Sequence, residues 1–197
     1  MKKFTTLKSI PAYLPIVNID TDMIIPKQFL KTIKRTGLGK NLFFEMRYDE
    51  KGNKINNFIL NNDPFNKSKI LVAGKNFGCG SSREHAVWAI YDYGFRAVVS
   101  SFFADIFKNN CLNIGVLPIQ VSDSFLEEIF LEIERDSTNT FEINLENQEF
   151  KIKSSNKKEK FDISAYKKSN MSNGFDDIDY LINKKDKISA FSNKTRY

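Results

Sequence analysis

A chain of 197 residues, of which 41% are hydrophobic, is long enough to form one domain around a sizeable core. Charged residues make up 27% of the chain, and its longest apolar runs, such as residues 70–73, are far shorter than the roughly 20 residues that cross a bilayer. These values argue against a disordered chain and against a membrane-spanning one.

The net charge of +6 is concentrated in the C-terminal part of the chain. Residues 1–150 carry 18 Lys and Arg against 18 Asp and Glu, whereas residues 151–197 carry 12 against 6. The excess is mostly Lys among Asn and Ser, without the aromatic residues that indicate base stacking. We therefore expect a solvated basic surface rather than a nucleic-acid site.

Two further features bear on the cellular compartment. Residues 1–15 contain no apolar stretch followed by a small-residue cleavage site, so we expect no secretory signal. The two cysteines, Cys79 and Cys111, are too few for a disulfide framework. Both features favour a reducing, cytoplasmic location.

The N-terminal part of the chain predicts a strand followed by a long irregular segment. Ile16 to Ile25 begins apolar, turns polar around Asp20 and becomes apolar again, which indicates a strand, a loop and a new element. Residues 27–63 then show no regular period and contain many Gly and Asn. We expect this segment to be mobile and to carry function.

The middle of the chain alternates between strand and helix patterns, which is typical of a largely parallel sheet. The expected strands are Ile70 to Ala73, Phe95 to Ser100 and Val116 to Val121, and the expected helices are Ser82 to Tyr93, ending at Gly94, and Phe102 to Asn110. Three elements follow: a helix from Asp123, as its cap, to Arg135, a hairpin of Thr140 to Leu145 with Glu149 to Lys153, and a last helix from Asp176 to Phe191.

The candidate site is the glycine-rich segment Gly74 to His85, between an expected strand and an expected helix. Its glycines allow close approach of a ligand, and the free N–H groups of the helix's first turn favour an anion. Ser81 is a candidate nucleophile or base there, and the planar guanidinium of Arg83 suits a carboxylate. The alternative is that Ser81 or Ser82 only caps the helix.

Familiar catalytic motifs do not fit this segment. It contains no P-loop, no third Rossmann glycine and no Gly-x-Ser-x-Gly elbow. The single histidine, His85, is expected to be a hydrogen-bond partner near the helix start rather than a catalyst, and Cys79 a small packed residue. Asp20 and Asp22 are either turn-forming residues or a functional pair. We expect no metal site in this chain.

Four segments closely resemble the small subunits of bacterial 3-isopropylmalate dehydratases: Asn18 to Leu30, Asn76 to His85, Ser101 to Phe107, and Asn173 to Ile178. The similarity covers nearly the whole chain in order and at matching spacing. The run Gly80 to His85 is also shared with the fourth domain of aconitases, so that run marks the superfamily.

This resemblance implies an α/β fold, a swivelling β/β/α domain as in the aconitase fourth domain. The domain would span residues 1–197, with a mobile substrate loop at about 31–62 and a C-terminal helical tail at about 164–197. It implies a hydro-lyase that isomerises 2-isopropylmalate to 3-isopropylmalate in leucine biosynthesis, together with a large subunit. It also implies a [4Fe–4S] cluster bound by that partner and not by this chain.

The resemblance also implies residue roles. Ser81 would be the base that takes a proton from the substrate, and Arg83 with Ser82 would hold a substrate carboxylate. Asp22 would orient a catalytic histidine of the large subunit. Arg35 would be a further substrate arginine, with Arg47 as its rival.

Two positions depart from the family pattern, and several alternatives remain. Met46 stands where a tryptophan is expected, and the Ser101-Phe102-Phe103 run replaces a Pro-Ser-Phe-like one. Relatives acting on homoaconitate or methylmalate share the architecture, although the apolar residues of Thr36 to Phe44 favour an isopropyl group. A non-catalytic RNA-binding relative and a stand-alone serine enzyme are the alternatives from other classes.

Overall fold

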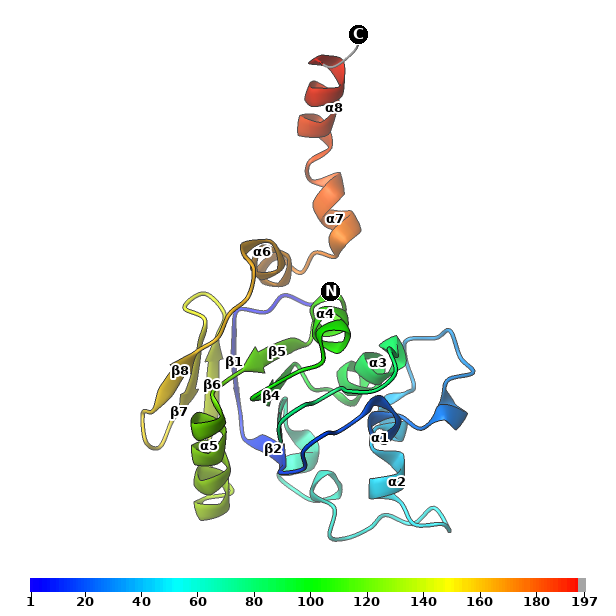
Figure 1. Ribbon diagram of the computed structural model, residues 1–197, viewed down its shortest axis with the longest axis vertical. Helices are drawn as coiled ribbons and strands as arrows, with labels where there is room; N and C mark the ends of the chain where they lie inside the picture. Colours follow the sequence, from blue (N-terminus) through cyan, green and yellow to red (C-terminus); the bar gives the residue numbers. More distant parts are fainter. Residues whose placement is uncertain (195–197) are drawn as a thin grey trace.

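The computed structural model describes residues 1–194, which form a layered α/β body and a protruding C-terminal arm (Figure 1). The body contains two four-stranded sheets. The parallel sheet has the order β2-β3-β4-β5, with β2 Pro11–Leu14, β3 Ile70–Ala73, β4 Ala97–Ser100 and β5 Leu117–Gln120. The antiparallel sheet has the order β1-β6-β7-β8, with β1 Thr6–Ser9, β6 Phe141–Asn144, β7 Glu149–Ile152 and β8 Lys158–Lys160.

The parallel sheet is the central layer because both of its faces are apolar. All four residues of β3 are buried, as expected for a strand covered on both sides. Leu71 and Ala73 belong to the core beneath the helices, whereas Ile70 and Val72 belong to the core shared with the antiparallel sheet. The result is a β/β/α arrangement, which confirms the expected α/β class.

Helices cover one face of the parallel sheet, and one long helix closes the other core. The first group comprises α1 Thr21–Ile24, α2 Phe44–Arg47, α3 Glu84–Tyr93 and α4 Asp105–Ile114. Helix α5, Asp123–Arg135, buries Phe125, Leu126, Ile129 and Ile133 against the strands of both sheets. Gly94 ends α3 with φ of 119°, as its position in the sequence predicts.

Several expected boundaries were wrong for local reasons. The first strand of the parallel sheet is β2, not the segment beginning at Ile16. Helix α4 starts at Asp105 because the residues before it pair with the loop after β3, and it continues past Asn110 to Ile114. The cap of α5 is Ser122, whose hydroxyl accepts from Phe125 N–H at 3.2 Å, and not Asp123. The last expected helix is two helices, and strands β1 and β8 were not expected.

The irregular segment before β3 contains only short elements. Besides α2 it includes three 3-10 turns, Lys27–Phe29, Gly39–Asn41 and Ile59–Asn61; α1 precedes it, and a fourth turn, Phe65–Lys67, follows it. Leu38, Leu42 and Phe43 are nevertheless fully packed into the core beneath the helices. The segment is therefore anchored at its middle, and its expected mobility stays a prediction.

The C-terminal part contains α6 Ala165–Asn173, α7 Asp177–Ile182 and α8 Lys185–Lys194. Figure 1 shows α7 and α8 leaving the body as an arm, and residues 195–197 of the expected tail lie outside the described residues. The N-terminus lies at the base of this arm, where the Met1 amine donates to Gly174 O at 2.9 Å. None of the helices in residues 1–194 is long and apolar enough to cross a membrane.

Candidate active site

The loops that follow β2, β3 and β4 are joined to one another beyond the ends of their strands. Parallel strands place their carboxyl ends at one edge of the sheet, where such loops meet. Four backbone hydrogen bonds join them: Gly78 N–H to Ile19 O at 2.7 Å, Thr21 N–H to Cys79 O at 3.1 Å, Phe77 N–H to Phe102 O at 3.0 Å, and Ala104 N–H to Phe77 O at 3.2 Å. The glycine-rich loop is therefore held on both sides.

An aromatic cluster of Phe77, Phe103 and Phe107 packs against this loop. The ring of Phe77 lies edge-on to Phe107 at 5.3 Å and to Phe103 at 6.3 Å between centroids. Gly78 has φ of +75°, and a Cβ atom there would lie 2.2 Å from Cγ of Phe107. Only glycine fits at this position, because both the backbone conformation and the ring exclude a side chain.

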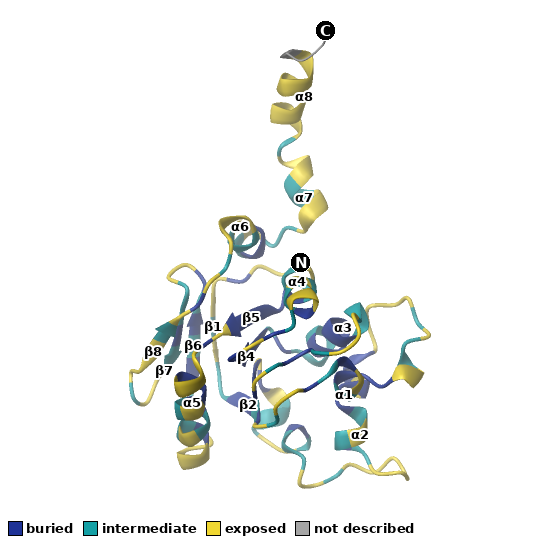
Figure 2. Cartoon of the chain, viewed as in Figure 1, coloured by how far each residue is buried: buried dark blue, intermediate teal, exposed yellow. Residues whose placement is uncertain are grey.

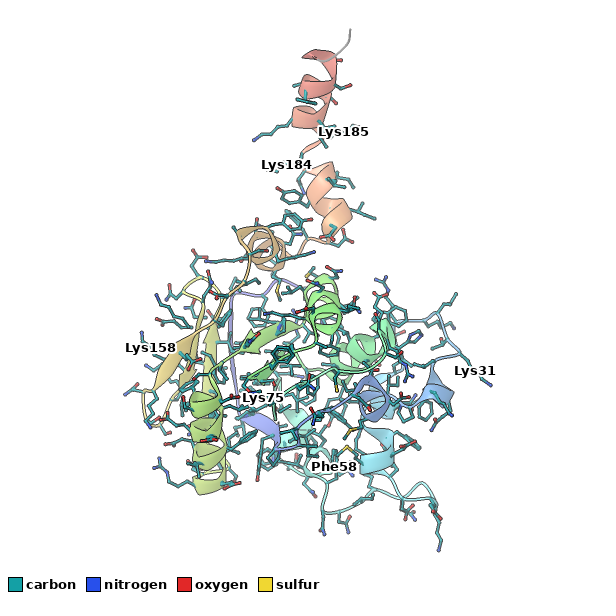
Figure 3. All side chains as sticks on the ribbon, in the orientation of Figure 1. Lys31, Phe58, Lys75, Lys158, Lys184 and Lys185 are labelled. Carbon is teal, nitrogen blue, oxygen red and sulfur yellow. The ribbon has the colours of Figure 1, made fainter. Side chains whose placement is uncertain are left out.

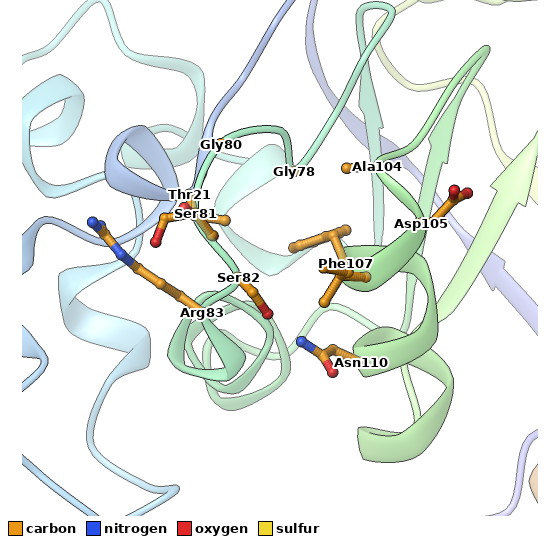
Figure 4. Close-up of a pocket in the computed structure, with 11 residues that line it drawn as sticks. Thr21, Gly78, Gly80, Ser81, Ser82, Arg83, Ala104, Asp105, Phe107 and Asn110 are labelled. Atoms are coloured by element: carbon orange, nitrogen blue, oxygen red, sulfur yellow. The ribbon is translucent and has the colours of Figure 1, made fainter.

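The loop and the start of α4 enclose an open pocket of about 270 Å³ (Figure 4). It is lined by Thr21, Gly78, Gly80, Ser81, Ser82, Arg83, Ala104, Asp105, Ile106, Phe107 and Asn110. Helices α3 and α4 both begin at this pocket, and within residues 1–194 neither has a side-chain cap hydrogen bond at its N-terminus. Two uncapped helix starts make the pocket suitable for an anion.

Ser81 and Ser82 are exposed at the pocket, and neither caps α3. The cap residue is Arg83, so the alternative reading of the two serines as caps was wrong. The Thr21 hydroxyl donates to Ser81 O at 2.9 Å and fixes the backbone there. In the described part of the chain the Ser81 hydroxyl itself has no hydrogen-bond partner, so it is free to act on a ligand.

Arg83 forms an ion pair with Asp22, on the first turn of α1. The Arg83 side chain is only 19% exposed, whereas Asp22 is 54% exposed. Asp20, the other carboxylate of this turn, caps α1 by accepting from Met23 N–H at 2.7 Å. The structure thus separates the two aspartates: Asp20 is structural, and Asp22 reaches the site through Arg83.

His85 and Arg35 connect α3 to the irregular segment. The Nε2 atom of His85 lies 2.8 Å from Thr32 O, and the His85 ring packs on Trp88 at 4.5 Å. Arg35 lies over the Trp88 ring at 5.4 Å, with its Nη2 atom 3.9 Å from Glu84. Arg35 is largely exposed, but it does not line the pocket in this conformation.

Arg47, in contrast to Arg35, is buried. It is 6% exposed, and its Nη1 atom lies 3.3 Å from Leu42 O and 3.4 Å from Gly39 O. Its Nε atom donates to Asn61 Oδ1 at 3.2 Å. The guanidinium therefore holds the irregular segment together, and its donors are engaged by this chain's own carbonyl groups.

The apolar residues expected to surround an isopropyl group do not line this pocket. Leu38, Leu42 and Phe43 lie in the core, and Met46 packs partly against it. Sequence reasoning read their hydrophobicity as substrate specificity, whereas it serves to anchor the segment. The exposed apolar residue that does line the pocket is Ile106, on the first turn of α4.

The two cysteines are not arranged for metal binding. Burial raises the pKa of the Cys111 thiol inside α4 well above its usual range. Burial, and secondarily the Asp20 carboxylate, also raise the pKa of Cys79. Within residues 1–194 no group of three or more His, Cys, Asp or Glu side chains is placed to hold a metal ion.

Comparisons with known proteins agree with this geometry. The family model described as the aconitase C-terminal domain matches residues 1–124. The 3-isopropylmalate dehydratase small subunit of Pelagibacter ubique is 60% identical over 191 residues, which cover 97% of this chain and 92% of that one. The one from Azobacteroides pseudotrichonymphae is 56% identical over the whole of both chains.

A solved structure is similar over nearly its whole length. The 3-isopropylmalate dehydratase from Methanocaldococcus jannaschii superposes with a TM-score of 0.68 at 29% identity, covering 94% of this chain and 98% of that one. The chain therefore belongs to the aconitase C-terminal domain family and, within it, to the 3-isopropylmalate dehydratase small subunits.

Proposed function

We propose that this chain supplies half of the active site of a 3-isopropylmalate dehydratase. With its large subunit, this hydro-lyase isomerises 2-isopropylmalate to 3-isopropylmalate by dehydration and rehydration in leucine biosynthesis, in the cytoplasm. The names of full-length relatives support this assignment. The observation that carries it is the open pocket where Ser81, Ser82 and Arg83 meet two uncapped helix starts.

Ser81 is the proposed base. Its hydroxyl stands at the pocket without a partner in residues 1–194, and the first-turn N–H groups of α3 and the nearby guanidinium favour negative charge on its oxygen. In the dehydration step the Ser81 oxygen takes the proton from the carbon next to the one that loses hydroxide. Delivering a proton to the carbon that lost hydroxide, while hydroxide from water adds to the carbon that lost its proton, completes the isomerisation.

Arg83 and Ser82 are the proposed carboxylate-binding residues. Within residues 1–194 the Arg83 guanidinium has one carboxylate partner, Asp22, and its other N–H groups remain for a substrate carboxylate. Asp22 is half-exposed on the outer side of this pair, where it can also accept a hydrogen bond from a histidine of the large subunit. Arg35 is the proposed second carboxylate ligand, which requires it to leave Trp88 and turn toward the pocket.

The large subunit is the proposed cover of the pocket. Four large apolar side chains are exposed on the segments around the site, namely Val17 (59%), Ile33 (94%) and Phe102 (47%) on loops and Ile106 (57%) on the first turn of α4. Exposed apolar residues grouped around a polar pocket are typical of a protein interface. Such a cover would exclude water from the reacting groups.

The [4Fe–4S] cluster is proposed to belong to the large subunit. Cluster binding requires several thiolates, and this chain has one half-buried and one fully buried cysteine, so its residues do not fit the cluster. When bound by the partner, the cluster supplies a Lewis-acidic iron for the departing hydroxyl. The residues of this chain then hold the substrate and move the proton.

The test is turnover of 2-isopropylmalate by this chain mixed anaerobically with a cognate large subunit. Activity should require both subunits, and Ser81→Ala should lower kcat by about 10² or more, as expected for loss of a general base. Ser82→Ala should mainly raise KM, and Ser169→Ala, on the exposed side of α6, should change neither. Full activity of Ser81→Ala would contradict the assignment of the base. RNA binding with steep salt dependence and no turnover would favour the RNA-binding alternative.

A further inference from the structure

The arm formed by α7 and α8 carries large apolar side chains that are largely exposed within residues 1–194. Helix α7 has no buried residue, and Figure 2 shows nearly the whole arm as exposed. The exposed fractions are 68% for Ile178, 57% for Leu181, 64% for Ile182, 52% for Ile188 and 71% for Phe191. Soluble proteins seldom leave such a group uncovered unless it binds something.

These side chains are spaced for one helix face. Ile178, Leu181 and Ile182 stand at i, i+3 and i+4 on α7, and Ile188 and Phe191 stand three apart on α8. Hydrogen bonds from Lys184 N–H to Leu181 O and from Ile188 N–H to Lys184 O carry the helical path across the break between the two helices. The arm thus offers apolar anchors of the kind that fill a groove on a partner.

The base of the arm is fixed, so the arm cannot simply fold back onto the body. Asp177 accepts hydrogen bonds from Lys167 Nζ and Tyr166 Oη, each at 2.8 Å, and from Asn170 at 3.3 Å. The Tyr166 and Tyr180 rings pack edge-to-face at 4.7 Å. Asp176 and Asp179 add a capping box at the start of α7. These contacts hold the arm pointing away from its own core.

Charge is divided along the arm. The α7 half carries Asp176, Asp177 and Asp179, and the α8 half carries Lys184, Lys185, Lys187 and Lys194 with one opposing charge, Asp186. Lys184 and Lys185 project at the joint between the helices (Figure 3). A complementary surface would be basic opposite α7 and acidic opposite α8.

The length of the arm distinguishes between two possible partners, a second copy of this chain and a larger protein with a groove. Residues 177–194 form about 27 Å of helix at 1.5 Å per residue. Two such helices from two copies of the chain would make fewer than three heptads of contact, less than a stable coiled-coil pair or a standard interface needs. A groove that surrounds a single helix buries more of its surface. A larger partner with a preformed groove is therefore favoured over a second copy.

We infer that the α7–α8 arm docks into an apolar groove of the large subunit, with a basic rim along α7 and an acidic rim along α8. This inference rests on the proposed function, because it takes the large subunit to be the partner. It gives the small subunit a second attachment, separate from the loops around Ser81. The arm then contributes to affinity and not to the chemical step.

The test measures binding of the small subunit to the large subunit by isothermal titration, alongside turnover. Leu181→Gln with Ile188→Gln keeps helix propensity and removes two anchors, and Leu131→Gln makes the same change at an exposed position of α5. The double variant should bind at least about tenfold more weakly, whereas the control should bind like wild type. At saturating small subunit, kcat should be unchanged. Circular dichroism on the free chains checks that all three fold alike.

Each other result overturns the inference. Equal affinity of the double variant and wild type would show that the arm does not dock. Lower kcat with unchanged affinity would place the arm in the chemistry. A wild-type dimer in light scattering that the double variant loses, with unchanged affinity for the large subunit, would make a second copy the occupant. If wild type gives no turnover but the affinities differ as expected, only the proposed reaction fails.

Discussion

Two arginines of the same irregular segment lie in opposite environments, one buried and one exposed. Arg47 is buried and donates to three carbonyl groups and to Asn61, whereas Arg35 is exposed and rests on Trp88. In the sequence the two residues look alike, because both are arginines in a segment without a regular period. What differs is the set of backbone carbonyls that the fold brings around Arg47, and a local pattern does not encode it.

We expect Arg47→Gln to lower the free energy of unfolding by about 2 kcal/mol, because buried carbonyls lose a charged donor. Arg35→Gln should leave that free energy within about 0.5 kcal/mol of wild type and raise KM by about tenfold or more. Urea unfolding and steady-state kinetics of the two-subunit enzyme measure both. A stable, low-affinity Arg47 variant would reverse the two assignments.

At Gly78 the space beside Phe107 is too small for even one added carbon atom. Gly78→Ala places a methyl group against Phe107 in addition to straining a positive φ, so we expect a loss of about 2–4 kcal/mol in the free energy of unfolding. Gly52→Ala is the matched control, since Gly52 has φ of +80° and no neighbour within 4 Å of a Cβ atom. The control should lose only about 1 kcal/mol. Equal losses in urea would mean that the Phe107 ring moves aside freely.

Among the helices and strands, the sequence predicted those that a local pattern of residues specifies. Strand β3 and helix α3 were predicted because a full apolar run and a glycine stop are visible without knowledge of the fold. Strands β1 and β8 were missed because they are short and largely polar, and they are strands only through pairing with distant partners. Helix α4 was predicted too early because Phe102 to Ala104 pair with Phe77 instead of coiling.

In the candidate site, too, the residues found from sequence are those whose pattern is local. The glycine-rich loop, Ser81 and Arg83 were found from sequence because they lie within one short run. The ion pair of Arg83 with Asp22 joins residues 61 positions apart, and the aromatic support from Phe107 comes from another helix. Contacts of this kind become visible only when the loops after the parallel strands are brought together.

The joint between α6 and α7 should respond to acid. The hydrogen bond from Lys167, followed by that from Tyr166, lowers the pKa of Asp177 below its usual value. A depressed pKa in the folded state means that the joint is stabilised above the unfolded pKa, near 3.9, and loses this stabilisation as pH falls through the folded value. We expect the Asn170 side-chain amide signal in NMR to titrate with a midpoint below about 3.9. Asp177→Asn should abolish the transition, and a midpoint above that value would contradict the proposed network.

For the whole molecule, the division into body and arm makes a prediction about stability. Because α7 buries no residue, deleting residues 178–197 should leave the Tm of the body within about 1–2 °C of wild type. Differential scanning calorimetry measures this, and an equal deletion at the N-terminal end is the contrasting variant, since Phe4 is buried and β1 pairs with β6. A large drop in Tm after the C-terminal deletion would mean that the arm supports the core.

The pairing of β1 with β6 also sets an order of events during synthesis. Thr6 pairs with Asn144, and Phe4 N–H donates to Met171 O at 2.9 Å, so the first strand finds its partners only after most of the chain has left the ribosome. At about 5–20 residues per second that wait is on the order of ten seconds. The parallel sheet can assemble meanwhile, because β2 to β5 are complete by residue 120. We therefore expect the glycine-rich loop to form on the nascent chain before the second core closes, and long-range closure of the antiparallel sheet to be the slow step of folding.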